Sequence, residues 1–133
     1  MRIVVDTNVV ASAIFFGGKP KQLIDVLFKK QAEAYVTSDI ILEYGETVEY
    51  LLNKYPQKPA AIPLATIIER MNIIEAKTDV NICRDPDDNK FIGCAVDAKC
   101  LYIVSGDKDL LELGAYEDVE IITVAEFMDR LNK

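Results

Sequence analysis

The chain has 133 residues, a length typical of one domain, and 50% of them are hydrophobic, which is enough for an ordinary packed core. It contains no histidine, so Ser-His-Asp and Cys-His nucleophilic sites are excluded, as is zinc bound by histidine. The formal net charge of -7 argues against a protein that binds nucleic acid by electrostatic attraction alone.

The three cysteines form no CxxC pair, and the longest apolar runs are too short to span a membrane. We interpret the thiols as buried or free in a reducing cytoplasm. Because Met1 leads straight into an apolar run, we expect no signal peptide. The expectation is a cytoplasmic protein without a membrane partner.

The first half of the chain begins with consecutive β-branched residues without polar alternation, which is typical of a strand buried on both faces of a parallel sheet. Two glycines end the helix that follows, and a proline at the first helical position starts the next helix. Three prolines mark a surface connection near the middle of the chain. In chain order we predict a strand at 3–5, a helix at 9–16, a helix from Pro20, a strand at 34–37, a helix capped by Thr37 or Ser38 and running to Leu51, and the connection at 53–62.

The second half continues the alternation of strands and helices. Asp85 and Pro86 are a typical cap and first-turn pair, which predicts a helix start. Thr123 and Glu126 match a capping box, which opens the last helix. In chain order we predict a helix at 64–71, a short strand within 72–79, a helix from Asp85, a strand at 101–104, a helix at 107–113, a strand at 119–122 and a helix from Thr123 through Leu131.

Strands that alternate with helices indicate an α/β protein, and we predict one domain over residues 1–133. The expected architecture is a three-layer α/β/α sandwich with a mainly parallel central sheet. In such sheets ligands bind at the edge formed by the carboxyl ends of the strands. We expect four acidic residues at this edge: Asp6, Glu43, Asp88 and Asp107.

Each of these acids also has an ordinary structural role open to it. Asp6 could cap the helix after the first strand, although its two neighbours could do the same. Glu43 could be a solvated helix residue, and Asp107 a turn or helix-start residue. Asp88 could complement a helix dipole, but it heads an apolar stripe that Phe91 and the following turn continue, so its side chain is expected to face the sheet edge. Together, the four positions favour a shared site.

Four carboxylates held close together repel each other unless a cation compensates them. Ligands that are all oxygen select Mg²⁺ or Mn²⁺ over zinc, and such a metal suits phosphodiester hydrolysis. Two divalent cations would cancel the four charges. The hydroxyls of Thr7 and Ser105 and the amide of Asn8 could orient the carboxylates or site waters, or could serve only in capping and turns.

The segments around the four acids resemble the PIN-domain family, and in particular the bacterial and archaeal PIN proteins classed as toxins of toxin–antitoxin pairs. The resemblance implies Mg²⁺- or Mn²⁺-dependent cleavage of RNA at an acidic site formed by the same four residues. It also implies frequent homodimers and inhibition by a cognate antitoxin protein. The resembling segments are residues 4–8 (VVDTN), 38–44 (SDIILEY), 83–91 (CRDPDDNKF) and 103–110 (IVSGDKDL).

Two alternatives to a metal-dependent ribonuclease stay open. A haloacid-dehalogenase-like phosphatase also places an Asp after its first strand, but it needs a second Asp where this chain has Asn8. The second alternative is a PIN fold that acts as a binding scaffold and has little catalytic turnover. The absence of a Gly-x4-Gly-Lys-Ser/Thr segment argues against a P-loop enzyme. Five basic residues could contact phosphate or be only solvated side chains: Lys19, Lys21, Arg84, Lys90 and Lys108.

Overall fold

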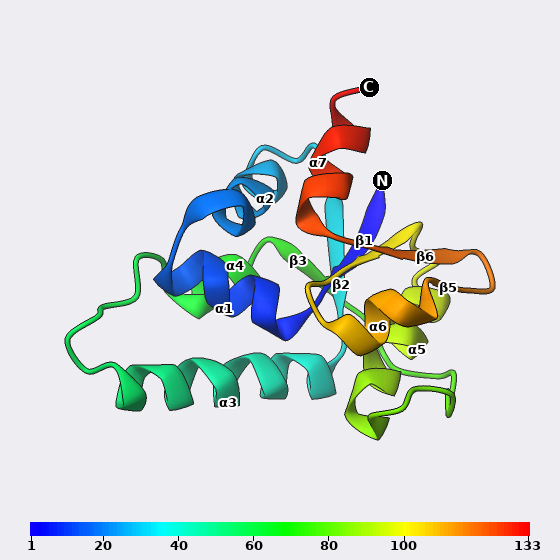
Figure 1. Ribbon diagram of the computed structural model, residues 1–133, viewed down its shortest axis with the longest axis horizontal. Helices are drawn as coiled ribbons and strands as arrows, with labels where there is room; N and C mark the ends of the chain where they lie inside the picture. The colour runs from blue at the N-terminus through cyan, green and yellow to red at the C-terminus, as the bar shows by residue number, and fades with distance from the viewer.

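A six-stranded sheet forms the centre of the protein, of which the computed structural model describes residues 1–133 (Figure 1). The strand order is β3-β2-β1-β4-β6-β5, and all neighbouring strands are parallel except β5, which is antiparallel to β6. The strands are β1 (Arg2–Val5), β2 (Glu33–Val36), β3 (Met71–Ile73), β4 (Tyr102–Val104), β5 (Ala115–Tyr116) and β6 (Val119–Ile122).

Helices cover both faces of the sheet. One layer contains α1, α2 and α7, in which α2 packs against both others, and α5 lies across β1, β2, β4 and β6 on the opposite face (Figure 1). The predicted three-layer sandwich is therefore confirmed. No helix combines the length and the apolarity that crossing a bilayer would require. The helices are α1 (Thr7–Phe15), α2 (Gly18–Phe28), α3 (Ser38–Lys54), α4 (Leu64–Ile68), the 3₁₀ helix η1 (Pro86–Asp88), α5 (Asn89–Asp97), α6 (Lys108–Leu113) and α7 (Val124–Leu131).

The central strand β1 is buried on both faces, as its β-branched sequence predicts: Ile3, Val4 and Val5 are each 0% exposed. The sheet grows from β1 to β2 and β3 on one side, and from β4 to β6 on the other. The boundary between β1 and β4 is therefore the topological switch point, where open α/β sheets form their ligand crevice. Two of the four acids, Asp6 and Asp107, follow these two strands.

Three predicted helix caps are confirmed. The Thr37 hydroxyl accepts a hydrogen bond from the backbone N–H of Ile40, and the Asp85 carboxylate accepts one from the backbone N–H of Asp87. Thr123 forms both hydrogen bonds of its capping box. Local capping chemistry thus fixes where α3, η1 and α7 begin.

Other predicted boundaries were wrong. The helix predicted at 64–71 ends at Ile68, and β3 begins at Met71 because it pairs with β2. The connection predicted at 53–62 is shorter, since α3 continues to Lys54. The two-residue strand β5 was not predicted; it exists through its pairing with β6.

Candidate active site

Asp6 lies at the carboxyl end of β1 with its carboxylate buried and only 4% of the residue exposed. Its side chain forms no capping hydrogen bond to α1, so capping does not account for its position. Instead, the buried hydroxyl of Ser105 donates a 2.7 Å hydrogen bond to Asp6 Oδ2. Burial raises the pKa of Asp6, the Ser105 hydrogen bond opposes this, and the charges of Asp107 and Glu43 raise the pKa further. A nearby cation would stabilise the ionised form of a carboxylate that is buried in this environment.

Asp88 and Asp107 form a carboxyl pair beside Asp6. Asp88 ends η1 without capping α5, whereas Asp107 caps α6 through a 3.3 Å hydrogen bond from the Asp109 N–H to Oδ1. Burial, followed by the hydrogen bond and the negative charge of Asp107, raises the pKa of Asp88 to about 7. A negative charge this close disfavours the ionised form of Asp88, so this carboxyl is about half protonated at neutral pH.

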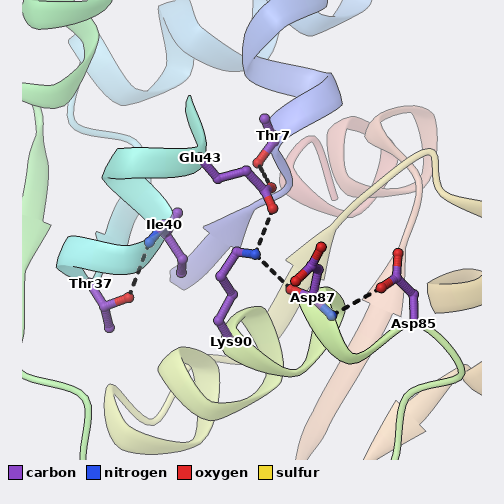
Figure 2. Close-up of polar contacts among 7 residues, drawn as sticks. All are labelled: Thr7, Thr37, Ile40, Glu43, Asp85, Asp87 and Lys90. Carbon is purple, nitrogen blue, oxygen red and sulfur yellow. Dashed lines mark hydrogen bonds and ion pairs between the residues drawn. The ribbon is translucent and has the colours of Figure 1, made fainter. Parts of the chain in front are cut away.

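Glu43 points toward the same edge from α3 (Figure 2). The Thr7 hydroxyl donates a hydrogen bond to Glu43 Oε2, and Lys90 Nζ lies 2.5 Å from Glu43 Oε1. Lys90 Nζ also donates a 2.8 Å hydrogen bond to the backbone carbonyl of Asp87. Lys90, one of the candidate phosphate contacts, is therefore the counter-charge of Glu43 and connects α5 to α3.

Two residues that sequence analysis missed position these acids. Tyr44 is fully buried, and its hydroxyl donates a 2.5 Å hydrogen bond to the Val5 carbonyl, which fixes α3 against the end of β1. The Asn89 side chain accepts hydrogen bonds from the backbone N–H groups of Ile82 and Cys83, which holds the loop before η1. Tyr44 could have been found, because a tyrosine on an apolar helix face needs a partner for its hydroxyl.

Of the remaining predicted residues, Asn8, Arg84 and Lys108 are neighbours of the acids along the chain, whereas Lys19 and Lys21 are exposed on α2. Asn8 is exposed. Arg84 Nη1 lies 3.6 Å from Asp109 Oδ1, and Lys108 Nζ lies 4.0 Å from Glu112 Oε1, with both cations largely exposed. A pocket of about 290 Å³ next to Asp88 is lined by both apolar and charged residues: Ile82, Cys83, Arg84, Asp88, Asp109, Leu110, Glu112 and Leu113.

The four acids lie at the edge formed by the carboxyl ends of the strands, but their side chains are not arranged as a complete set of metal ligands. No three acidic, histidine or cysteine side chains are arranged to hold a metal ion, so the role of the four acids as metal ligands stays a prediction. Glu43 is turned toward Lys90, while Asp88 pairs with Asp107. The donor chemistry nevertheless fits a hard cation, because all four side chains are oxygen ligands, and burial together with neighbouring negative charges raises the pKa values of Asp6 and Asp88.

A comparison with models of protein families identifies the family to which this chain belongs. Residues 2–109 match the model of the PIN domain, and this segment includes all four acids. The chain belongs to the PIN-domain family. PIN domains are generally nucleases, so membership supports a hydrolase and argues against the haloacid-dehalogenase-like phosphatase.

Two individual proteins are similar to this PIN-domain chain. An uncharacterized protein of Methanocaldococcus jannaschii is 35% identical over 117 residues, which cover 85% of this chain and 75% of the relative. In the crystal structure of VapBC2 from Rickettsia felis bound to a DNA fragment from its promoter, one chain is 14% identical and superposes with a TM-score of 0.57. That similarity covers 91% of this chain and 97% of the other, and it supports the fold.

Proposed function

We propose that this PIN-domain protein is a metal-dependent endoribonuclease that hydrolyses RNA phosphodiester bonds with Mg²⁺ or Mn²⁺. The observation that carries the proposal is the uncompensated charge at the switch point. Asp6 is buried beside two other negative groups, and burial, followed by the hydrogen bond and negative charge of Asp107, raises the pKa of Asp88 to about 7. A divalent cation resolves both conditions, and phosphodiesters are the substrates that such a site serves best.

The residues have separate roles in this proposal. Asp6, Asp88 and Asp107 would hold the cation, with Ser105 orienting Asp6 through its hydrogen bond. When bound, the cation would supply charge neutralisation and Lewis acidity at the phosphate. Lys90 keeps Glu43 at the edge of the site and places a positive charge near the incoming phosphate. Because the cation would displace the proton from Asp88, metal affinity should increase with pH near neutrality.

We further propose that the protein acts in the cytoplasm as the toxin of a toxin–antitoxin pair, as a homodimer. The support is the PIN-domain match together with the structural similarity to a chain of the VapBC2 complex. Induced expression of the wild type should arrest growth, and Asp6→Asn should not. Co-expression of a small protein encoded beside the gene should relieve the arrest, and sedimentation of the purified chain would report the dimer.

The experiment that tests the nuclease is cleavage of a mixed RNA panel by purified protein with Mn²⁺, Mg²⁺ or EDTA. The variants are Asp6→Asn and Asp88→Asn, which keep the side-chain shape and remove one ligand charge each. Asp87→Asn is the matched control, because its exposed side chain carries the same charge one residue from Asp88. We expect metal-dependent cleavage by the wild type and the control, and a loss of at least about 100-fold in both ligand variants.

Cleavage that persists in both ligand variants would identify a contaminating nuclease and remove the acidic site from the proposal. Folded protein that cuts nothing with either metal would favour the binding scaffold instead. Circular dichroism of each variant separates lost chemistry from lost folding.

A further inference from the structure

The acidic residues of this protein are distributed unevenly. Of the 22 acidic residues, none lies between residues 7 and 24 and none between residues 50 and 68. These two segments contact each other in the fold, since the Ala61 N–H donates a 2.9 Å hydrogen bond to the Ile14 carbonyl. In a chain with a net charge of -7, neither segment contributes a negative side chain to the region where they meet.

This surface carries exposed aromatic rings next to lysines. Phe16 is 58% exposed, Tyr50 59% and Tyr55 42%. Lys58 Nζ lies 4.4 Å from the centroid of the Phe16 ring, and Lys54 Nζ lies 5.6 Å and 5.5 Å from the Tyr50 and Tyr55 centroids. Neither lysine forms a salt bridge. We call these five residues the lysine–aromatic patch.

The patch lies at the far ends of the two helices that begin at the acidic site. The first, α1, starts directly after Asp6 and ends beside Phe16, and α3 carries Glu43 and ends at Lys54. Figure 1 shows α1 and α3 running side by side in the same direction toward the loop that follows α3, and the two helices are in contact. Lys54 lies eleven positions after Glu43 on α3, which corresponds to about 16 Å along the helix axis.

An uncharged stripe on α1 connects the acidic site to the patch. Asn8, Ser12 and Phe16 recur every four residues, so they share one helix face, and none of them is buried. No residue of α1 carries a charge. The acids on the neighbouring stretch of α3, Glu46 and Glu49, would repel an anionic chain, which leaves the α1 face as the route between site and patch.

We propose that the lysine–aromatic patch binds single-stranded RNA next to the bond that is cleaved at the acidic site. Aromatic side chains stack on unpaired bases of any sequence, and lysines pair with the phosphates between them. The α1 stripe offers an amide and a hydroxyl for hydrogen bonds along the way. This inference rests on the proposed function for its substrate, and it accounts for how an acidic protein could attract a polyanion at one defined surface.

The test is equilibrium binding of a fluorescently labelled single-stranded RNA of about 12 nucleotides, within the usual site sizes for such surfaces. Measured in EDTA, where cleavage is switched off, fluorescence anisotropy gives the dissociation constant. We expect the double variant Lys54→Gln/Lys58→Gln to bind more weakly and to reduce the slope of log K against log salt by about 1.4, because two phosphate contacts are lost. Phe16→Ala and Tyr55→Ala should each weaken binding about tenfold through a lost stack.

The matched control is Lys29→Gln/Lys99→Gln, which removes two exposed lysines that precede β2 and β4 at the opposite edge of the sheet. This variant has the same net charge as the patch variant, and its affinity and salt slope should equal those of the wild type. RNA carrying a photoreactive uridine should also crosslink to Tyr50 or Tyr55. Equal loss of affinity in both double variants, or crosslinks confined to other surfaces, would overturn the proposal.

Two further outcomes distinguish RNA binding by the patch from a protein interface and from the cleavage step. If the patch variants change only the sedimentation of the protein and leave RNA affinity intact, the patch is a protein interface and the proposal is wrong. Cleavage of the same RNA by wild type with Mn²⁺ is measured in parallel. If the wild type does not cleave the RNA with Mn²⁺, the proposed nuclease activity is contradicted. The RNA affinity of the patch is measured separately in EDTA, so its result would still stand.

Discussion

The raised pKa of Asp88 makes the stability of the protein depend on pH. Its pKa is raised from the ordinary 3.8 to about 7 by burial and by Asp107. Between these two values the folded state keeps a proton that the unfolded chain has released, so stability falls as pH rises through this window. Below the unfolded-state pKa and above the folded-state pKa, the folded and unfolded states carry the same charge at Asp88. Its contribution to the free energy of unfolding is then independent of pH.

Comparison of wild type with Asp88→Asn isolates this effect, since asparagine does not titrate. In metal-free buffer we expect the stability of the wild type relative to the variant to decrease steadily between about pH 4 and pH 7 and then to level off. Urea denaturation at intervals across this range measures the difference. A flat difference would show that Asp88 is ionised throughout.

Lys90 is the second residue whose role can be measured directly. Lys90→Met removes the cation that contacts Glu43, and Glu43 then adds uncompensated negative charge near the metal ligands. We expect Mn²⁺ to bind more tightly by about 1 kcal/mol, roughly fivefold, measured by calorimetry, while cleavage falls. Lys90→Arg should restore wild-type affinity.

Lys108→Met is the control for that measurement, because it removes the same charge from an exposed residue whose salt bridge is with Glu112 and not with Glu43. Equal tightening in Lys90→Met and Lys108→Met would attribute the effect to net charge and not to the contact with Glu43.

At the scale of secondary-structure elements, α5 depends on close contact with the loop before it. A Cβ added at Gly93 would lie 3.0 Å from the backbone carbonyl oxygen of Thr78. The same loop is also held by Asp97, four residues after Gly93 on α5, whose carboxylate accepts hydrogen bonds from the backbone N–H groups of Lys77 and Thr78. The loop therefore has little freedom to move away from α5, which carries Lys90 and follows Asp88.

Two glycine-to-alanine substitutions test this packing. Gly93→Ala should destabilise the protein by about 1–3 kcal/mol through the close contact. Gly45→Ala, inside α3 with nothing within 4 Å of the added Cβ, should instead stabilise it by up to about 1 kcal/mol through helix propensity. Urea denaturation of both variants gives the comparison. A Gly93→Ala protein as stable as wild type would mean that the 76–80 loop adapts.

At the scale of the whole molecule, metal binding and folding are coupled, because the acids come from segments far apart in the chain. A cation that binds only the folded arrangement at about 100 times its dissociation constant adds about 2.7 kcal/mol, which raises Tm by roughly 10 °C for a domain of this size. We expect Mn²⁺ to raise the Tm of wild type and of Asp87→Asn in thermal scans. Asp6→Asn should show little shift, and a shift equal to that of wild type would exclude Asp6 as a ligand.

Sequence patterns predicted the parts of the fold that local chemistry controls. The buried strand at 3–5 and the caps at Thr37, Asp85 and Thr123 depend on neighbouring residues only, and the structure confirms them. The short strands β3 and β5 were misjudged, since a two- or three-residue segment becomes a strand through pairing with a distant one. The position of the four acids near strand ends and helix starts followed from the same local patterns.

The sequence by itself determined the α/β architecture, the position of Asp6 after a buried strand and the oxygen-only chemistry of the site, because hydrophobic periodicity and residue type depend on no distant partner. Only the tertiary structure decided that Ser105 binds Asp6, that Lys90 neutralises Glu43 and that Tyr44 fixes α3 to β1. It also brought the two segments without acidic residues together. These contacts join residues 39 to 99 positions apart, and which side chains meet over such separations depends on the packing of the whole sheet and its helices.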